Sequence, residues 1–327
     1  MYNILIPDHI YNDINIEKRI LGEDFNIRYY SDSTRLDDIS QQELSIADGI
    51  LAWDKYSYDI TLIDKLKSCK IIVRVGAGVD NFDLKYARSK AISICNTPAY
   101  GLDEVAEHTI ALALSLSRRL PYFHDQILDE KWPRTAIGIK RLRGITFGII
   151  GCGRIGSAVS QRAKALGFNV LIYDPFLEEG KDKYLMLKRV TSIKELLNQS
   201  DVVSLHVPLN EETYDLLNYT HLKEFKENSI LVNTSRGEVV DPKLIIRGLL
   251  ERKFLGVGLD VYKTEPIKND SDLYEILNHQ DPDICTRLIV SSHAAYYSSQ
   301  SSIEMREMAS ETLKAYLLNN LCFNCMN

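Results

Sequence analysis

Short β-like runs alternate with helix-like segments from the start of the chain, and this alternation limits the possible folds more than any other feature. The runs at 3–6, 26–30, 49–52, 71–75 and 92–95 have the length and composition of strands. The segments between them, at 12–21, 36–45, 60–68 and 83–89, are typical of helices. Such alternation predicts a parallel sheet with helices on both faces. We therefore expect the first ~100 residues to form one compact α/β unit.

A second alternation follows a long helix expected at 103–120. Its strands are expected at 145–151, 169–173, 202–207, 229–233, 256–261 and 288–292, and its helices at 155–166, 192–199 and 242–251. Six strands with crossover helices are what a complete dinucleotide-binding sheet needs. A last helix is expected at 297–319, directly after the sixth strand.

The position of the last helix indicates how the two units are connected. A chain of 327 residues is long enough for two domains. The sequence predicts an α/β protein in which a Rossmann-type doubly wound parallel sheet, residues 100–294, is inserted into a smaller flavodoxin-like α/β substrate domain, residues 1–99 plus 295–327. A ligand bound to the inserted domain would then face a cleft closed by the smaller one.

The stretch GCGRIG at 151–156 stands between an expected strand and an expected helix. Gly151 allows a tight turn, Gly153 lets a pyrophosphate approach the backbone, and Gly156 lets helix and strand pack closely. Asp174 ends the next strand, close to the spacing of ~20 residues at which an acidic side chain binds the ribose hydroxyls. A carboxylate there would repel a 2′-phosphate, so the pattern favours NAD over NADP. The alternative is a glycine-rich turn without a ligand.

Three polar residues follow strands of the second alternation. Arg236 follows SILVNTS, Glu265 follows GLDVYKT and His293 follows LIVSS, so all three are expected at the carboxyl edge where ligands bind. Arg236 can hold a carboxylate and stabilise charge on a carbonyl oxygen. His293 can exchange a proton with that oxygen, while Glu265 favours the imidazolium and orients the ring. The set suits hydride transfer between NADH and a 2-oxo acid.

The other histidines and the cysteines give weaker signals. His206 ends a strand near the expected cofactor edge and is interpreted as lining the nicotinamide–ribose side. The remaining histidines do not form a set of metal ligands, so no metal is expected. Cys322 and Cys325 form a C-x-x-C without a second pair, which we interpret as thiols of a cytosolic protein and not as zinc ligands.

Composition excludes several other classes of function. The net charge of -6 argues against nucleic-acid binding, which needs a basic face. The longest apolar runs, such as 109–117, are shorter than the ~20 residues that span a bilayer. The opening MYNILIPDHI lacks the pattern of a signal peptide. We therefore expect a cytoplasmic protein that binds neither nucleic acid nor membrane.

Several motifs in order give the chain a resemblance to a known family. They are RVGAGVDNFD (74–83), NTPAYGLDEVAEHTIALAL (96–114), GIIGCGRIG (148–156), HVPLNEET (206–213), LVNTSRGEVVD (231–241), GLDVYKTEP (258–266) and SSHAAYYS (291–298). The chain resembles the D-isomer-specific 2-hydroxyacid dehydrogenases over nearly its whole length. Its segment HAAYYSSQSSIEMREMA is similar to the branch that contains the C-terminal binding proteins, which are NADH-binding corepressors.

The resemblance implies a role for each matched residue. The catalytic residues would be Arg236, Glu265 and His293. Backbone N–H groups of Val75, Gly76, Ala77 and Gly78 would meet the substrate carboxylate. Cofactor contacts would come from Arg154, Ile155, Asp174, His206, Thr213, Thr234, Ser235, Arg236 and Asp260. Members are usually homodimers paired through the nucleotide domains, so a homodimer is expected.

Two departures from the family pattern bear on the substrate. Tyr296 stands where the corepressor branch has a tryptophan, which keeps an aromatic wall and adds a hydroxyl. Lys55 is the only basic residue of the segment 51–60, and a phosphate would need more positive charge. We therefore expect a small unphosphorylated 2-oxo acid, with Trp53 and Tyr100 as pocket walls; core packing is the alternative for Trp53. The acidic stretch 269–288 is expected to loop over the sheet edge.

Three functions remain open at this point. The first is reversible NADH-dependent reduction of a 2-oxo acid to the D-2-hydroxy acid. The second is a corepressor-like scaffold with vestigial activity, which would need only the cofactor cleft; the intact Arg236–Glu265–His293 set favours the first. The third is a phosphoglycerate or phosphite dehydrogenase; phosphite enzymes of this type carry a lysine in the loop occupied here by 75–78.

Overall fold

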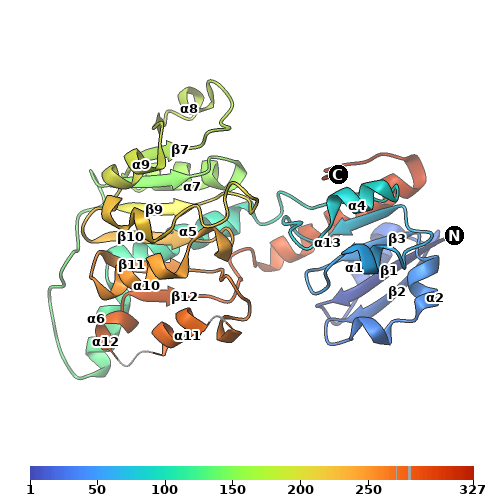
Figure 1. Ribbon diagram of the computed structural model, residues 1–327, viewed down its shortest axis with the longest axis horizontal. Helices are drawn as coiled ribbons and strands as arrows, with labels where there is room; N and C mark the ends of the chain where they lie inside the picture. The colour runs from blue at the N-terminus through green and yellow to red at the C-terminus, as the bar shows by residue number, and fades with distance from the viewer. Residues whose placement is uncertain (270, 279–280) are drawn as a thin grey trace. The chain divides into compact units, whose positions relative to one another are not determined.

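A computed structural model describes residues 1–269, 271–278 and 281–327 (Figure 1). The chain divides into two compact units: a first unit of Met1–Gly101 with Ser298–Asn327, and a second unit of Leu102–Tyr297. Each unit is built on its own parallel sheet. Among the described residues, no helix combines the length and the apolar character needed to cross a bilayer.

The first unit has a five-stranded sheet in the order β2-β1-β3-β4-β5, which is the flavodoxin-like order. Its strands are β1 (Tyr2–His9), β2 (Phe25–Ser31), β3 (Gly49–Ala52), β4 (Ile71–Arg74) and β5 (Ser93–Cys95). All four pairings are parallel, and the central strand β3 is buried along its whole length. The strands match the predicted runs closely because each is a short apolar segment between polar turns.

Helices cover both faces of this sheet. They are α1 (Asn15–Leu21), α2 (Gln41–Ile46), α3 (Ile60–Ile63), α4 (Leu84–Ser89) and α13 (Ser299–Asn319). The helix predicted at 36–45 is divided into a 3-10 turn, Leu36–Asp38, and α2. The division is at Ser40, whose hydroxyl accepts a hydrogen bond from the Glu43 N–H and so begins a new helix.

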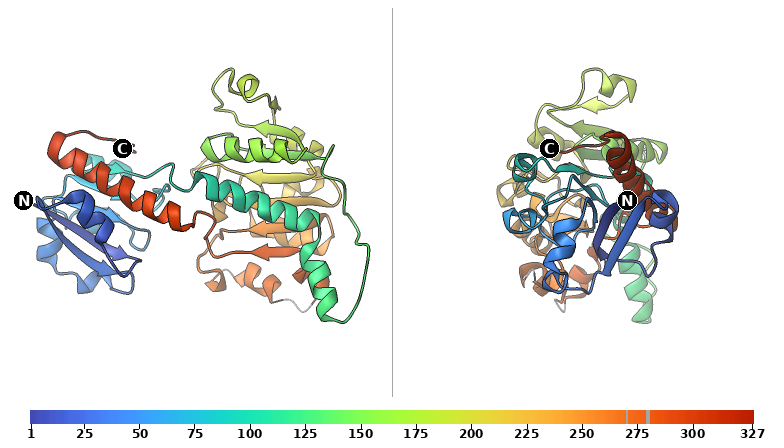
Figure 2. Two further views of the ribbon diagram at one scale, coloured as in Figure 1. Left: turned by 180° about the vertical axis from the view of Figure 1, so that it is seen from behind. Right: turned by 90° about the vertical axis from the view of Figure 1, so that its right-hand side faces the viewer.

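The last helix completes the first unit, although it is separated from the rest of that unit in sequence (Figure 2). Met305, Ala309, Leu313 and Leu317 recur at every fourth position of α13 and are buried. The same helix carries Arg306, which binds both carboxylate oxygens of Glu17 on α1, at 2.7 and 2.6 Å. The side chains of Glu17 and Arg306 are only 3% and 6% exposed, so this is a buried ion pair.

The second unit has a seven-stranded sheet in the order β12-β11-β10-β9-β6-β7-β8, a Rossmann-type doubly wound arrangement. Its strands are β6 (Thr146–Ile150), β7 (Asn169–Tyr173), β8 (Lys188–Arg189), β9 (Val202–Leu205), β10 (Ser229–Asn233), β11 (Phe254–Leu259) and β12 (Leu288–Val290). Strand β6 pairs with β7 on one side and β9 on the other, all parallel. This is where the strand order reverses, and ligands bind beyond the carboxyl ends of such strands.

Two apolar cores lie on the two faces of this sheet. One packs α5 (Leu102–Ser117) and α7 (Arg154–Ala165) on the strands, and the other lies beneath α9 (Ile193–Gln199) and α10 (Pro242–Leu250). The remaining elements are α6 (Leu120–Leu128), α8 (Lys181–Tyr184), α11 (Ser271–Leu277), α12 (Pro282–Cys285) and the 3-10 turns Tyr219–Glu224, Gly237–Val239 and Ile267–Asn269.

Three elements of the second unit differ from the sequence prediction. The short edge strand β8 is a seventh strand where six were expected. The helix expected to end near Leu120 breaks at Arg119, whose φ is +53°, and α6 restarts with Pro121 in its first turn. The acidic stretch 269–288 is helical over α11 and α12, because Leu273, Ile276 and Ile284 are buried in the core. Residues 270, 279 and 280 of that stretch lie outside the described part of the chain.

Replacing Glu17 by glutamine removes the buried counter-charge of Arg306 and leaves only the exposed carboxylate of Asp13, 3.7 Å away. We expect the free energy of unfolding to fall by about 3–5 kcal/mol, the usual cost of breaking a buried pair. Glu307→Gln is the matched control: it breaks a pair with Arg19 between the same two helices, but these side chains are 36% and 63% exposed. It should cost less than about 1 kcal/mol. Urea titration measures both, and equal losses would contradict the account.

The same pair predicts a pH dependence. Burial alone would raise the pKa of Glu17, but hydrogen bonds from Arg306 and His9 outweigh burial and lower that pKa from 4.5 to about 2. A carboxyl group whose pKa is lower in the folded chain than in the unfolded chain stabilises the fold at pH values above its unfolded pKa. This stabilisation is lost as the pH falls through the folded pKa. The difference in the free energy of unfolding between the native chain and Glu17→Gln should therefore shrink as the pH falls from 4.5 towards 2.

Candidate active site

Glu265 and His293, two of the three predicted catalytic residues, are in direct contact. His293 Nδ1 donates a hydrogen bond to Glu265 Oε2 at 2.8 Å, and Tyr262 N–H donates to Oε1 at 3.1 Å. Burial alone would raise the pKa of Glu265, but the hydrogen bond and charge of His293 outweigh it and lower that pKa below its usual value. Glu265 is thus an anion that orients the imidazole, which leaves Nε2 of His293 to exchange a proton.

Asp260 holds the segment that carries His293. Its carboxylate accepts hydrogen bonds from Ala294 N–H and Ala295 N–H, both at 2.9 Å, and from the Ser291 hydroxyl at 2.6 Å. Its carbonyl oxygen accepts from His293 N–H at 2.8 Å. These bonds hold His293 in the left-handed region, at φ +54°, which costs energy for a residue with a side chain.

Arg236 lies on a turn that is stabilised by hydrogen bonds with the Asn233 side chain. The Asn233 side chain, buried at the end of β10, accepts from the N–H and the hydroxyl of Ser235 and donates to the carbonyl oxygen of Arg236, at 2.8–3.0 Å. Arg236 Nη1 donates to the Ser235 carbonyl at 2.7 Å. Sequence reasoning missed Asn233; the signal was a polar residue ending an apolar strand, directly before the proposed arginine turn.

Tyr262 joins the three loops that carry Arg236, Glu265 and His293. A Cβ placed on Gly237, next to Arg236, would lie 1.9 Å from the Tyr262 carbonyl carbon, so the two backbones are in contact. The Tyr262 hydroxyl donates to the Ser291 carbonyl at 2.5 Å, two positions before His293. Because its N–H also binds Glu265, Tyr262 fixes all three loops against one another. This residue too was missed.

The glycine fingerprint has the backbone that phosphate binding requires. Gly151 has φ +89°, and a Cβ on Gly156 would lie 2.0 Å from the Gly151 carbonyl oxygen, so α7 packs against the turn. A Cβ on Gly153 would meet nothing within 4 Å. Gly153 is the residue before α7 and has no side chain to cap the first N–H groups of this helix. Such a helix start attracts an anion.

Comparison with known proteins agrees with this geometry. Residues 110–295 match the model of the D-isomer specific 2-hydroxyacid dehydrogenase, NAD binding domain. A glyoxylate reductase from Korarchaeum cryptofilum is 35% identical over 274 residues, 82% of this chain and 79% of that protein. This chain belongs to the D-isomer-specific 2-hydroxyacid dehydrogenases. It is therefore an NAD-dependent enzyme.

Two further relatives are informative. The crystal structure of D-lactate dehydrogenase from Aquifex aeolicus, complexed with NAD and lactic acid, has a TM-score of 0.84 at 32% identity and covers 96% of this chain and 95% of its own. C-terminal-binding protein 1 from Caenorhabditis elegans is 30% identical over 95% of this chain. The match spans only 42% of that protein's length.

The other polar residues assigned to the cofactor in this dehydrogenase mostly bind the protein itself. Asp174 accepts from Cys152 N–H and Phe176 N–H, both at 2.9 Å, which fixes its carboxylate beside the glycine turn. The hydroxyls of Thr213 and Thr234 bond Pro208 O and Thr109 Oγ1 at 2.6 and 2.8 Å. Burial lowers the pKa of His206 to about 3, so its ring is neutral at physiological pH.

Asp260, one of the predicted cofactor residues, is bonded to its own chain. It is 1% exposed, and both of its carboxylate oxygens accept hydrogen bonds from residues 291–295. Asp260 therefore anchors the His293 segment, and its contact with the cofactor stays a prediction.

The predicted substrate loop is partly used inside the first unit. Val75 N–H donates to Ala52 O at 2.7 Å, and Gly76 N–H donates to the Thr97 hydroxyl at 2.8 Å. Of the four N–H groups predicted to meet the substrate carboxylate, we therefore assign this role to those of Ala77 and Gly78. Sequence reasoning missed Arg74 beside this loop.

Arg74 brings a partly buried positive charge to the loop. Its side chain is 13% exposed, and Nη2 lies 3.6 Å from Asp54. A Cβ on Gly76 would lie 2.6 Å from Nη1, so the guanidinium rests on the loop backbone. An arginine at the end of an otherwise apolar, buried strand was the available signal.

The predicted pocket walls differ in environment. Trp53 is 3% exposed, and its ring packs edge-on against His9 and Tyr11 with centroids 5.6 Å apart in both pairs. Trp53 thus packs in the core of the first unit, and its role as a pocket wall stays a prediction. Tyr100 and Tyr296 are partly exposed, and Tyr296 directly follows the Ala295 that Asp260 anchors.

Substituting Gly237 by alanine should push the Arg236 turn away from Tyr262. We expect kcat/KM to fall by about 10²-fold, the cost of a displacement of roughly 1 Å in a positioned group. NADH binding, measured by fluorescence, should be retained. Glu238→Ala in the same turn adds no atoms and is the control. Unchanged kcat/KM in a folded Gly237→Ala variant would show that the contact does not position Arg236.

Proposed function

We propose that this dehydrogenase reversibly reduces a small, unphosphorylated 2-oxo acid to the D-2-hydroxy acid with NADH. The 2.8 Å Glu265–His293 contact, on loops joined to the Arg236 turn by Tyr262, is the observation that carries the proposal. The bound nicotinamide supplies or accepts the hydride. The protein supplies orientation, charge and the proton.

The three residues divide the work of binding, charge stabilisation and proton transfer. Arg236 binds the substrate carboxylate by two parallel hydrogen bonds and stabilises the negative charge that builds on the carbonyl oxygen. His293 donates its Nε2 proton to that oxygen in reduction and removes it in oxidation. Glu265 stabilises the imidazolium and holds the ring in place. The N–H groups of Ala77 and Gly78, with the Arg74 charge beside them, give the substrate carboxylate further donors.

The cofactor residues fit NAD. The pyrophosphate is assigned to the start of α7, at Gly153, Arg154 and Ile155, because these N–H groups point out of the helix end. Asp174 accepts the ribose hydroxyls and repels a 2′-phosphate. His206, Thr213, Thr234 and Ser235 are assigned to the nicotinamide side mainly through their backbone and through the turns that they build.

The preference for an unphosphorylated substrate rests on charge. Lys55, the basic residue of the 51–60 segment, donates to the carbonyl oxygens of Asp32 and Thr34 and is therefore used within the first unit. The relatives reported above include a glyoxylate reductase and a D-lactate dehydrogenase, which are named for small unphosphorylated acids. Tyr296, three positions after His293, is the proposed aromatic wall beside the substrate side chain.

A panel of 2-oxo acids tests the proposal. We expect NADH oxidation with glyoxylate, pyruvate or a branched-chain or aromatic 2-oxo acid, and a D-configured product wherever a chiral centre is formed. Phosphorylated 2-oxo acids should be poorer substrates, as judged by kcat/KM. Activity only with a phosphorylated acid would contradict the substrate class. Tight NADH binding without turnover of any acid would favour the corepressor-like scaffold.

Glu265→Gln tests the role of the carboxylate. The ionised Glu265 stabilises the positive charge that the His293 imidazole carries while it holds the proton to be donated, and the amide removes this stabilisation. Reduction requires that proton, and the alkaline limb of kcat/KM for reduction should therefore move to lower pH. The amide keeps the size of the side chain. A pH profile identical to that of the native enzyme would contradict the pairing.

We further propose a cytoplasmic homodimer. Leu128, Trp132 and Ile137, on α6 and the segment after it, are 70%, 78% and 85% exposed, and we propose this segment as part of the dimer surface. Sedimentation would give the mass of the assembly. The described structure leaves all six cysteines free, which suits a reducing compartment.

A further inference from the structure

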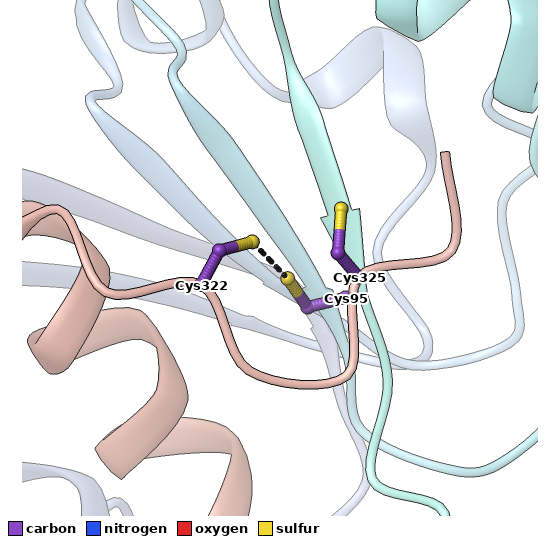
Figure 3. A group of neighbouring side chains, drawn as sticks. All are labelled: Cys95, Cys322 and Cys325. Carbon is purple, nitrogen blue, oxygen red and sulfur yellow. Dashed lines mark hydrogen bonds between the residues drawn. The ribbon is translucent and has the colours of Figure 1, made fainter.

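Three cysteine thiols, Cys95, Cys322 and Cys325, converge in the first unit (Figure 3). Cys95 ends β5, and Cys322 and Cys325 follow α13. Their Sγ atoms all lie within 4.8 Å of one another, and those of Cys95 and Cys322 are 3.5 Å apart. Cys95 and Cys322 are 227 positions apart in sequence, which is why the C-x-x-C alone gave no indication of a third ligand.

Backbone pairing, and not the thiols, sets this arrangement. The segment after α13 runs antiparallel to the outer edge of β5, with Cys325 opposite Cys95. Met326 N–H donates to Ile94 O at 2.8 Å, and Asn96 N–H donates to Asn324 O at 3.3 Å. The Asn327 side chain accepts from Ile94 N–H at 2.9 Å. The ligand atoms are therefore brought together before any ion binds.

We propose that Cys95, Cys322 and Cys325 form a binding site for a thiophilic metal ion, Zn²⁺ or Cu⁺. Thiolates are the ligands that select these ions. With Zn–S bonds of about 2.3 Å, sulfurs of a tetrahedral centre lie roughly 3.8 Å apart. That separation lies between the 3.5 Å distance from Cys95 Sγ to Cys322 Sγ and the 4.8 Å within which all three Sγ atoms lie. Small side-chain movements would suffice, and the exposure of Cys322 and Cys325 gives the ion an entry path.

A disulfide explains the cluster less well. It would join two sulfurs and leave the third without a role, whereas one ion uses all three. Zinc sites commonly join a C-x-x-C pair to ligands from another element; here Cys95 is the third ligand, and a water would fill the fourth position of a tetrahedral Zn²⁺. The bound ion would fasten the segment after α13 to β5, an edge strand whose outer side would otherwise offer unpaired backbone groups. Its role would be structural.

Co²⁺ titration of the full chain under anaerobic, reducing conditions tests the site. We expect one Co²⁺ per chain with thiolate-to-metal charge-transfer absorption, displaced by Zn²⁺, and a rise in Tm on Zn²⁺ binding. Cu⁺ supplied from a chelate buffer distinguishes the two ions by their relative affinity. The readouts are independent of dehydrogenase activity, which should not change.

Cys322→Ser and Cys325→Ser should each reduce the affinity for Co²⁺ at least about tenfold and weaken the charge-transfer band. Both side chains are exposed, so the fold should tolerate the substitutions. Cys285→Ser, at an exposed cysteine of the second unit, is the control and should bind Co²⁺ like the native chain. Absence of a thiolate band in the native chain would overturn the proposal. So would a band that survives in Cys322→Ser and Cys325→Ser, or a disulfide that forms in air while the reduced chain binds no ion.

Discussion

The close packing of Tyr262 against Gly237 is the contact on which the catalytic site depends. It brings the turn after β10 against the loop after β11, and the Tyr262 hydroxyl ties both to the segment after β12. Asp260 then fixes the His293 segment by hydrogen bonds to residues 291–295. A guanidinium, a carboxylate and an imidazole can act together only if the loops that carry them keep fixed positions. Lying at neighbouring strand ends does not fix the loops, so contacts between the loops are needed.

The first unit must hold a helix that is separated from it in sequence, because the whole of the second unit interrupts its chain. The buried Glu17–Arg306 pair and the apolar face of α13 hold the returning helix in place. The segment after α13 adds a backbone pairing along β5. The proposed metal site lies at this last pairing, so it would reinforce the closure of the interrupted unit.

Much of this fold could be predicted from the sequence, because parallel strands buried on both faces are short apolar runs that stand out between polar helices. The Glu265–His293 contact was also predictable, since carboxyl ends of neighbouring strands share an edge. Tertiary burial was harder to foresee. Nothing in the sequence indicated that the Asp260 carboxylate holds the backbone after His293, or that the Trp53 ring packs on His9 and Tyr11. Cys95 carries no local signal that connects it with Cys322, because only the completed sheet edge brings them together.

The central claim is that Glu265 acts on the reaction through His293, and a double-mutant cycle tests it most directly. Single-turnover rates of NADH oxidation would be compared for Glu265→Gln, His293→Gln and the double variant. If the two side chains act as a pair, the double variant should be about as slow as His293→Gln alone, since Glu265 has nothing left to influence. Losses that multiply in the double variant would show that the two residues act independently and would contradict the account.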